Sequence, residues 1–404
     1  MSSCRSCGTP LEQVFVDLGM SPLANSLLTS DDLSAPEAFY PLRALACSNC
    51  FLVQLEQYES PAAIFSNYAY FSSYSTTWLD HAEHYAAYAV DRFDLGPESF
   101  VVEVASNDGY LLQYFMEKGI PVLGIEPAAN VAQAALDKNV PTEVQFFGRE
   151  VAAQLALRRR ADLLVANNVL AHVPDLDDFV GGIAMLLAPH GTATLEFPHL
   201  LRLIEGEQFD TIYHEHLSYF SLLSVERVFA RRGLVINDVE ELPTHGGSLR
   251  IHVGHDGPGR PAVEELKHRE REAGLYDLAT YESFGAKVRR AKRDILSFFI
   301  DAKKADQRIV GYGAPAKGNT LLNYTGVGRD FIDYTVDLNP HKQGCFLPGT
   351  RIPILAPEVL NRTKPDLVFV LPWNLSDEII EQMGHVFEWG GKFVTRVPEL
   401  RVYG

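Results

Sequence analysis

The segment from Tyr213 to Tyr219 concentrates side chains that can move protons. Its sequence is Tyr-His-Glu-His-Leu-Ser-Tyr. An imidazole can act as a base near neutral pH, and a phenol or a second imidazole can donate a hydrogen bond to a developing oxyanion. If the segment is helical, Tyr213 and His216 share a face; if it is extended, His216 shares its face with His214 instead. Glu215 could orient an imidazole or bind a hydroxyl or amine group of a ligand.

A metal site is one alternative interpretation of His214 and His216. Glu215 lies between them, and no histidine or carboxylate follows four residues later as a third ligand. This spacing does not match a catalytic metal site. A second alternative is a purely structural network at the start of a helix, in which these polar groups only satisfy one another.

Four of the five cysteines form two C-x-x-C pairs, Cys4 with Cys7 and Cys47 with Cys50. Together they supply four thiolates for a tetrahedral zinc ion, and four soft ligands with no open position make a structural site. The strand-like segments VFVDLG and FLVQLEQY would bring the two pairs together. Two disulfides or a redox pair are the alternatives, but neither pair lies in a βαβ context. Cys345 stands alone in a polar turn.

Composition and charge restrict the partners of the chain. Its formal net charge is −17, which disfavours a nucleic-acid backbone or an anionic membrane surface, since both require basic patches. No apolar run approaches the roughly 20 residues of a membrane-spanning helix. The N-terminal sequence MSSCRSCGTP has no hydrophobic core of a signal peptide. We therefore expect a cytoplasmic protein without nucleic-acid or membrane partners, and a monomer.

From about residue 80 the pattern alternates between strand, turn and helix. SFVVEVA is a buried strand that ends at Glu103, and PVLGIEP is the next strand, ending at Glu126. ADLLVANNVL and GTATLEFP are two further strands with helices between them. Such alternation predicts a parallel sheet that binds ligands at the carboxyl ends of its strands. His172 follows ANNVL and should lie at the same edge.

The turn over residues 103–109 is expected to bind a cofactor. Its small residues let the backbone approach a ligand, and Glu126 could accept both hydroxyls of a ribose. The turn lacks the G-x-G-x-x-G pattern, and the Glu103 carboxylate would repel phosphates. A cationic ligand fits better, and S-adenosylmethionine carries a sulfonium and an ammonium group. The alternative for Glu103 is a carboxylate that only caps the following helix.

A second α/β unit follows a charge-rich helical stretch over residues 263–305. RIVGYGAPAKGNTLLNY combines a strand, a small-residue turn and a helix, with Lys317 as a nearby cation. Such a turn is a possible anion site, although it is not a Walker A motif. The next strand ends at Asp337, and a further strand ends near Asn374. The alternatives are a nucleotide-binding site and a nucleotide-binding fold whose site is unused.

Taken together, the motifs of this chain resemble one family, the sugar C-methyltransferases that make branched deoxysugars for natural products such as antibiotics. Nucleotide-hexose 3-C-methyltransferases are examples. The resemblance covers nearly the whole chain in order, and YHEHLSYFS and GYGAPAKGNTLLN are its most distinctive parts. The other matching pieces are the paired C-x-x-C, VVEVASNDGYLLQ, GIEPAANVA, ANNVLAHVPDL and THGGSLR.

The resemblance implies that a base removes a proton next to a ketone, and that the resulting enolate takes the methyl group. His216 is then the general base, with Tyr213 as its competitor. A tyrosine base would need a large drop from a pKa of about 10, which favours histidine. His172 and Tyr213 would stabilise the enolate, and Glu215 would position the sugar. The substrate would be a dTDP-linked 4-keto-deoxyhexose, methylated at C-3.

The remaining site residues complete this prediction. The aromatic segment 66–78 is either a lid over the ligand or interdomain packing, and residues 244–250 are either a substrate contact or a tight turn. We expect S-adenosylmethionine to be bound by Glu103, Ala105, Ser106, Asn107, Gly109, Tyr110, Glu126, Pro127, Asn167, Asn168, Tyr70 and Ser75. We expect the substrate to be bound by Tyr68, Tyr74, His245, Lys317, Asn319, Asp337 and Asn374.

The predicted fold class is α/β with three domains. Residues 1–75 form a zinc-binding module, residues 76–255 a Rossmann-like class I methyltransferase domain, and residues 256–404 linker helices with a C-terminal α/β domain that binds the nucleotide sugar. Two other functions remain open from the sequence. One is an O- or N-methyltransferase acting on a nucleotide sugar, and the other is a non-enzymatic nucleotide-binding scaffold.

Overall fold

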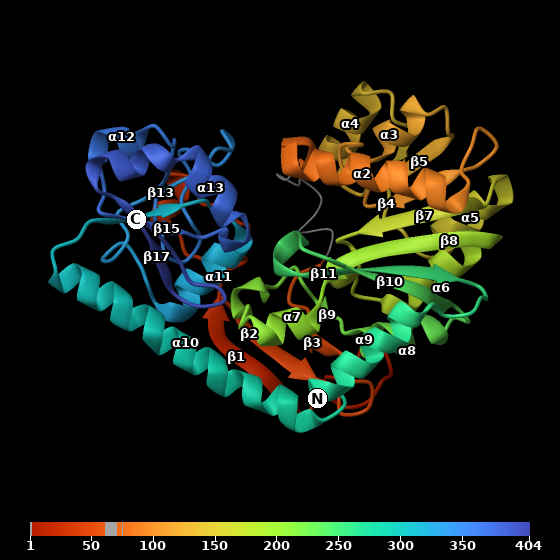
Figure 1. Ribbon diagram of the computed structural model, residues 1–404, viewed down its shortest axis with the longest axis horizontal. Helices are drawn as coiled ribbons and strands as arrows, with labels where there is room; N and C mark the ends of the chain where they lie inside the picture. The colour runs from red at the N-terminus through yellow and green to blue at the C-terminus, as the bar shows by residue number, and fades with distance from the viewer. Residues whose placement is uncertain (1, 61–70, 75) are drawn as a thin grey trace.

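The computed structural model describes residues 2–60, 71–74 and 76–404. The predictions made for Tyr68, Tyr70 and Ser75 concern residues outside these ranges. The described chain contains a four-stranded, a seven-stranded and a six-stranded sheet, which follow one another from the N-terminus to the C-terminus (Figure 1). None of the described helices combines the length and the apolar character that are needed to cross a bilayer.

The N-terminal sheet has the order β1-β2-β3-β9, and all its neighbours are antiparallel. Its last strand comes from the segment that follows the Tyr-His-Glu-His cluster, because Ser218 pairs with Gln54 and Tyr219 with Val53. The zinc module is thereby joined directly to the predicted catalytic segment. The strands are β1 (Gln13–Ser21), β2 (Tyr40–Ala46), β3 (Val53–Leu55) and β9 (Ser218–Tyr219).

The central sheet has the order β10-β11-β8-β7-β4-β5-β6. The five strands from β6 to β8 are parallel, and β11 is antiparallel to both of its neighbours. This is the sheet of the predicted class I methyltransferase fold. Its strands are β4 (Val101–Val104), β5 (Val122–Ile125), β6 (Thr142–Glu143), β7 (Ala161–Asn167), β8 (Leu187–Pro198), β10 (Val235–Leu242) and β11 (Ser248–Gly254).

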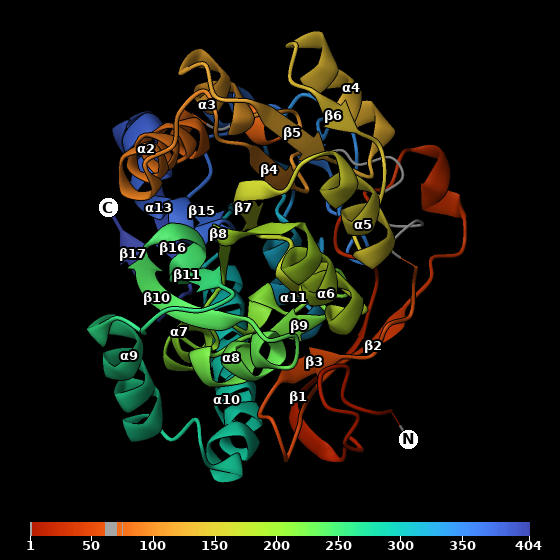
Figure 2. The same ribbon diagram turned by 90° about the vertical axis from the view of Figure 1, so that its right-hand side faces the viewer.

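Helices cover both faces of the central sheet (Figure 2). Side chains of a strand alternate between its faces, so Val101 packs under α2 and α3 whereas Val102 packs against α5 and α6. This explains why strands buried on both sides are continuous apolar runs. The covering helices are α2 (Thr76–Phe93), α3 (Leu112–Glu117) and α4 (Ala129–Asp137) on one face, and α5 (Arg149–Arg158), α6 (Leu176–Leu186) and α8 (Leu222–Ala230) on the other.

Two helices lead to the C-terminal sheet. The charge-rich stretch forms α9 (Pro261–Glu272) and the long α10 (Leu278–Lys304), as two joined helices. The sheet is parallel except for its last pair, and its order is β14-β13-β12-β15-β16-β17. Its elements are β12 (Ile309–Tyr312), α11 (Ala316–Thr325), β13 (Thr335–Val336), β14 (Ile354–Leu355), α12 (Val359–Thr363), β15 (Leu367–Val370), α13 (Ser376–Gln382), β16 (Lys392–Thr395) and β17 (Arg401–Tyr403).

The zinc module and the C-terminal domain share one apolar core. Helix α10 runs beside β1 (Figure 1), where the rings of Phe15 and Phe284 stack at 4.4 Å between centroids. The same core includes α7 (Leu200–Glu205) and residues of β12 and β15. Fully buried aromatic side chains of this size contribute strongly to stability. The three regions are therefore packed into one body around the candidate site.

Candidate active site

One cavity of about 700 Å³ extends from the carboxyl edge of the central sheet to the first turn of α11. All three regions of the chain line it: Asn25 comes from the zinc module, Glu126 from the central sheet and Lys317 from the C-terminal domain. The volume suits a cofactor together with part of a substrate. The predicted site residues that line it are Ala105, Asn107, Tyr110, Glu126, Pro127, Asn167, Asn168, His172, Tyr213, Glu215, His216, His245 and Lys317.

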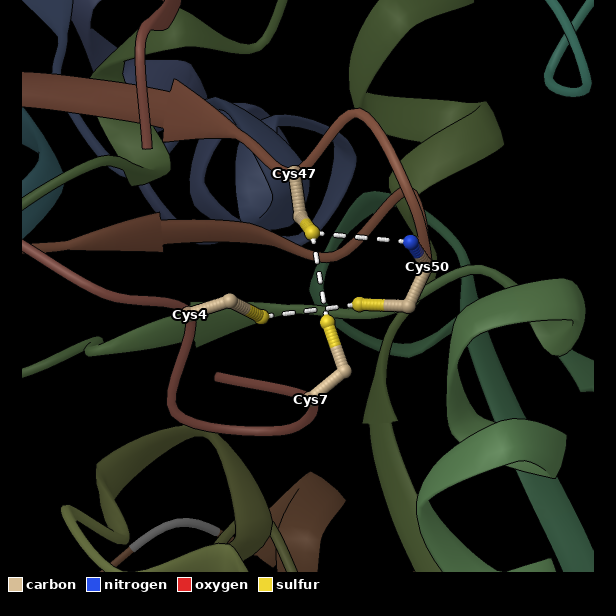
Figure 3. Close-up of side chains that lie close together, drawn as sticks. All are labelled: Cys4, Cys7, Cys47 and Cys50. Atoms are coloured by element: carbon tan, nitrogen blue, oxygen red, sulfur yellow. Dashed lines mark hydrogen bonds between the residues drawn. The ribbon is translucent and has the colours of Figure 1, made fainter. Parts of the chain in front are cut away.

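The four paired cysteines meet in space, as predicted (Figure 3). Their Sγ atoms all lie within 4.8 Å of one another, and the Cys4–Cys50 and Cys7–Cys47 sulfurs are each 3.5 Å apart. A tetrahedral zinc ion with Zn–S bonds of about 2.3 Å needs sulfurs about 3.8 Å apart, so the four thiols fit zinc. None of the described residues that line the cavity is a cysteine, and the zinc site is therefore structural.

The first turn after β4 is built for close backbone approach. Ala105 and Asn107 have φ angles of 58° and 50°, and Gly109 has a φ of 76°. The Glu126 carboxylate accepts hydrogen bonds from the backbone N–H of Asn107 (3.0 Å) and of Ala128 (2.9 Å). These bonds fix Glu126 at the cavity wall, where its carboxylate can accept ribose hydroxyls.

Glu103 lies below this turn and is fully buried. Burial raises the pKa of its carboxyl well above the usual range, and the nearby Glu126 and Asp108 carboxylates raise it further, whereas a hydrogen bond from Tyr110 lowers it. A cationic ligand above the turn would oppose both raising effects. Glu103 does not line the cavity itself, so any effect of its carboxylate on a ligand would be electrostatic and not a direct contact.

The asparagines after β7 offer further polar contacts. Asn167 and Asn168 line the cavity, and their buried Oδ1 atoms find no hydrogen-bond partner among the described residues. Buried acceptors of this kind are costly unless a ligand or water satisfies them. Together with Glu126, these acceptors fit the amino and hydroxyl groups of S-adenosylmethionine.

The Tyr-His-Glu-His segment forms a turn and is neither helical nor extended. The His216 N–H donates to the Tyr213 carbonyl at 2.9 Å, which brings both side chains to the same side. The Tyr213 hydroxyl and His216 Nε2 are 2.8 Å apart, and His216 Nδ1 lies 3.1 Å from the carbonyl oxygen of Thr211 in η4 (Phe209–Thr211). Nδ1–H therefore donates to Thr211, and Nε2 carries the lone pair.

The surroundings keep the imidazole of His216 neutral. Burial lowers its pKa well below the usual value, and the nearby His172, His245 and Lys317 lower it further, whereas the Thr211 carbonyl raises it. A neutral imidazole can accept a proton, so His216 is in the state that a general base requires. Its ring centroid lies 4.8 Å from that of His172.

His172 ends the short helix η3 (Leu170–His172) and faces the same cavity. Its Nδ1 donates to the backbone carbonyl of Glu215 at 2.7 Å. Burial lowers the pKa of His172 to about 4, although this carbonyl raises it. The imidazole is therefore neutral at physiological pH, and its orientation is fixed by the turn over residues 213–216.

Glu215 and His214 point in different directions. Glu215 lines the cavity, and Asn25 Nδ2 donates to both of its carboxylate oxygens, at 2.9 and 2.8 Å. Burial raises the pKa of Glu215 to about 7, against the lowering effect of these bonds. His214 instead packs beside Tyr40 and Tyr58 of the zinc module.

The C-terminal domain contributes a buried cation. Lys317 Nζ donates to Asn374 Oδ1 at 2.7 Å and lies 4.5 Å from the ring centroid of Trp373. Trp373 in turn donates to the buried Asp210 carboxylate at 2.7 Å. Burial lowers the pKa of Lys317 to about 8, whereas the Asp210 charge raises it. An ammonium group held in this way favours an anionic ligand.

The THGGSLR segment forms a tight interdomain turn, one of its two predicted roles, and it also brings His245 to the cavity. His245 lines the cavity with a φ of 56° in η5 (Thr244–Gly246). Gly246 has a φ of 89°, and a Cβ atom there would collide with the Trp373 ring. The glycine therefore permits a tight contact between the central and C-terminal domains, and this contact places His245 in the cavity.

Several predicted residues lie elsewhere among the described residues. Asn374 contacts Lys317 instead of lining the cavity, and Asp337 accepts a hydrogen bond from the Ala314 N–H at 2.7 Å. Tyr74 is 64% exposed and stacks on His341. Ser106, Gly109 and Asn319 are buried behind the cavity wall.

The structure also adds cavity residues that sequence reasoning missed. Asn25 lies in a loop of the zinc module, and Trp78 lies in the first turn of α2, where its ring centroid is 4.9 Å from that of His81. Lys342 and Thr211 line the cavity as well. Of these four residues, only Trp78 could have been predicted from the sequence, because it ends the aromatic segment 66–78. The others depend on contacts between distant parts of the chain.

Comparison with known families accounts for most of the chain. The family described as a zinc binding domain matches residues 4–65, a methyltransferase domain matches residues 78–239, and a C-methyltransferase C-terminal domain matches residues 243–398. The three matches follow the order of the predicted domains.

The chain is also similar to individual proteins. C-methyltransferase NovU from Streptomyces niveus is 36% identical over 406 residues, which cover 100% of this chain and 97% of that protein. A ubiquinone biosynthesis O-methyltransferase from Rhodopseudomonas palustris is 27% identical over 30% of this chain and 57% of its own length. The crystal structure of magnesium protoporphyrin IX methyltransferase from Synechocystis, with bound SAM, is 15% identical, covers 44% of this chain and 79% of that chain, and has a TM-score of 0.35.

Proposed function

The chain belongs to the family of S-adenosylmethionine-dependent C-methyltransferases, and from this premise we propose that it methylates the carbon next to the ketone of a dTDP-linked 4-keto-deoxyhexose. The proposed position is C-3, in the biosynthesis of a branched deoxysugar. One observation carries the proposal: a neutral imidazole, His216, is hydrogen-bonded to the Tyr213 hydroxyl inside the cavity that also contains the cofactor turn.

His216 takes the proton in the proposed reaction. The ketone acidifies the neighbouring C–H bond, and Nε2 holds the lone pair because Nδ1–H donates to the Thr211 carbonyl. The electron pair of the broken C–H bond moves into the enolate, and the proton goes to Nε2. The Tyr213 hydroxyl, 2.8 Å from Nε2, must turn from the imidazole towards the substrate. Tyr213 remains the competing base.

The enolate oxygen needs hydrogen-bond donors that are in place before the charge develops. The Tyr213 hydroxyl can supply one. We assign the second to His172, but its neutral ring gives its single N–H to the Glu215 carbonyl, so His172 would have to take up a proton at Nε2 before it could donate to the enolate. Glu215 itself would hold a hydroxyl or amine group of the sugar. Because all of these groups lie on one turn and the adjoining η3 helix, their mutual distances are set locally.

S-adenosylmethionine supplies an electrophilic methyl group on a positively charged sulfur when it is bound. We assign its ribose hydroxyls to Glu126 and its polar amine groups to the side-chain oxygens of Asn167 and Asn168. Glu103 would favour the positive charge from below. The new carbon–carbon bond uses the electron pair of the enolate, and S-adenosylhomocysteine is the other product.

The nucleotide part of the substrate would lie towards the C-terminal domain. Lys317 is a buried cation in the first turn of α11, and Lys342 lines the same end of the cavity. A helix N-terminus with a nearby cation is a favourable site for a diphosphate. We assign the diphosphate of the dTDP group to this end and the sugar to the space between Lys317 and His216.

Solvent exchange in D₂O tests this proposal. Without methyl donor, the protein should exchange the hydrogen next to the ketone of a nucleotide keto-sugar for deuterium, and with the donor it should add one methyl group to that carbon. NMR also shows whether C-3 or C-5 reacts, since the C-4 ketone acidifies both. His216→Asn should bind S-adenosylhomocysteine normally and lose both reactions. A methyl group on oxygen or nitrogen without exchange would overturn the proposal, and retained turnover in His216→Asn would move the base to Tyr213.

A further inference from the structure

A loop of the zinc module reaches into the candidate active site. The connection between β1 and β2 carries Asn25, which lines the cavity. Asn25 Nδ2 lies 2.9 Å from Glu215 Oε1 and 2.8 Å from Oε2. The two residues are 190 positions apart in the chain. A carboxylate that is 4% exposed is thus held by an amide from a different domain.

The same loop is fixed to the C-terminal domain. Leu28 forms a pair of backbone hydrogen bonds with Phe346, at 2.9 and 2.8 Å. The Gly349 N–H donates to the Glu37 carboxylate at 2.7 Å, and Arg351 donates to the carbonyl of Leu33 at 2.6 Å. At its ends the loop continues into β1 and β2. The backbone that carries Asn25 is therefore held by β1 on its N-terminal side and by the contacts with the C-terminal domain on its C-terminal side.

We propose that Asn25 is a positioning residue that the zinc module supplies to the active site, and that it holds Glu215 as an ionised acceptor for a donor group on the substrate. This inference rests on the proposed function of Glu215 as the group that positions the sugar. A carboxylate in this place selects a hydroxyl or a protonated amine next to the reacting carbon, because these groups can donate to it. A substrate with hydrogen at that position would lose this additional hydrogen bond to the buried carboxylate.

The electrostatics of the cavity agree with this role. Burial raises the pKa of Glu215 to about 7, and the side-chain and backbone N–H groups of Asn25 are what lower it. The other titratable groups that line the cavity are Tyr110, Glu126, His172, Asp175, Asp178, Tyr213, His216, His245, Lys317 and Lys342. Removal of the Asn25 side-chain donor should therefore raise the pKa of Glu215, and the protonated acid would then predominate at neutral pH.

Infrared titration of the buried carboxyl band tests the proposal without any substrate. The difference between the unmodified protein and Glu215→Gln isolates the band of Glu215. We expect its midpoint near pH 7, an upward shift of about one to two pH units in Asn25→Ala, and no shift in Ser26→Ala, which alters the exposed neighbour in the same loop. An unchanged midpoint in Asn25→Ala would overturn the proposal. Asn25→Asp keeps the shape of the side chain and should shift the midpoint upward as well.

Steady-state kinetics provide the second readout. In Asn25→Ala we expect KM for the keto-sugar to rise about tenfold at pH 7 and to recover as the pH is raised above the new midpoint, while the affinity for S-adenosylhomocysteine stays unchanged. A defect that is the same at every pH would mean that the loop has only a structural role. If no keto-sugar reacts with the unmodified protein, the proposed function fails, whereas the infrared titration still decides the role of Asn25.

Discussion

The central and C-terminal sheets have the same kind of turn at the end of a strand, but the charges near the two turns are opposite. In the central sheet, Glu126 accepts the backbone N–H of Asn107 at 3.0 Å; in the C-terminal sheet, Asp337 accepts that of Ala314 at 2.7 Å. Both acidic residues end or follow the neighbouring strand. The difference is that Glu126 faces the cavity, whereas Asp337 lies 3.6 Å from the Lys342 ammonium group.

The topology of each sheet fixes where a ligand can bind, and the charged side chains nearby determine whether a cation or an anion fits there. The central turn has two buried carboxyls, Glu103 and Glu126, and suits a cation. The C-terminal turn has its acid neutralised and adds the buried cation Lys317, so it suits an anion. A single cavity joins the two turns, and a cationic methyl carrier and an anionic nucleotide sugar can meet in it.

The largest expected effect comes from Glu126→Ala. The loss of a carboxylate that accepts two ribose hydroxyls should weaken binding of S-adenosylhomocysteine about 100-fold. The affinity for the nucleotide sugar should be nearly unchanged, because that ligand is assigned to the other turn. Isothermal titration measures both, with the exposed Glu150→Gln as control. Equal losses of affinity for both ligands would mean that the two ligands do not bind at separate turns. The Glu126→Gln variant shows how much of the loss depends on the charge of the carboxylate.

Lys317→Met should have the opposite pattern. We expect KM for the nucleotide sugar to rise about 30-fold and cofactor affinity to stay within about twofold, with the exposed Lys304→Met as control. The charge of Lys317 also lowers the pKa of His216, so its removal should raise that pKa and move the acid limb of the rate profile to higher pH. Rates measured from pH 5 to pH 9 reveal the shift. An unchanged acid limb would mean that the charge of Lys317 does not affect the pKa of the catalytic base.

The sequence alone supported much of this comparison. The sequence predicted strand ends at Glu103, Glu126 and Asp337, each within one residue of where β4, β5 and β13 end. The two C-x-x-C pairs predicted the zinc site because ligand number and spacing are local properties. The Tyr-His-Glu-His segment was recognised by its residue types, but its turn geometry was not, since helical and extended forms were both compatible with the spacing. In the structure, a backbone hydrogen bond from His216 to the Tyr213 carbonyl closes the segment into a turn.

Contacts between distant segments could not be predicted from the sequence, because they form only when separate domains pack together. Asn25 and Trp373 reach the site only after the zinc module and the C-terminal domain pack against the central domain, and no periodicity records that packing. Strand β9 has two residues, too short for a pattern. Tyr74 and Asn319 had suitable residue types, but exposure in one case and burial in the other keep them from the cavity wall.

The Glu103→Gln variant tests whether the carboxylate below the central turn favours a cationic ligand. S-adenosylmethionine carries a sulfonium that S-adenosylhomocysteine lacks, so at a pH high enough to ionise Glu103 the variant should lose about tenfold in affinity for the first and less for the second. Because burial raises the pKa of Glu103 above 4.5, the folded state holds a proton that the unfolded state releases, and Glu103 makes the protein less stable as the pH rises above that value. The midpoint temperature of thermal unfolding should therefore decrease less steeply between pH 5 and pH 8 in the variant than in the unmodified protein. Equal losses for the two ligands would place the sulfonium away from Glu103.

The smallest effect is expected for Lys342→Ala, which tests why Asp337 does not make the C-terminal turn a cation site. The Lys342 ammonium group is partly exposed, with 26% of its side chain accessible, and lies 3.6 Å from the carboxylate. Its removal leaves Asp337 unneutralised beside the proposed diphosphate site, and KM for the nucleotide sugar should rise about threefold. If this repulsion is the cause, Asp337→Asn in the same background should restore most of the affinity, although Asp337 also accepts the Ala314 N–H. A double variant that is as weak as Lys342→Ala would mean that Lys342 contacts the substrate directly, and the charge at this turn would then depend on two lysines instead of one.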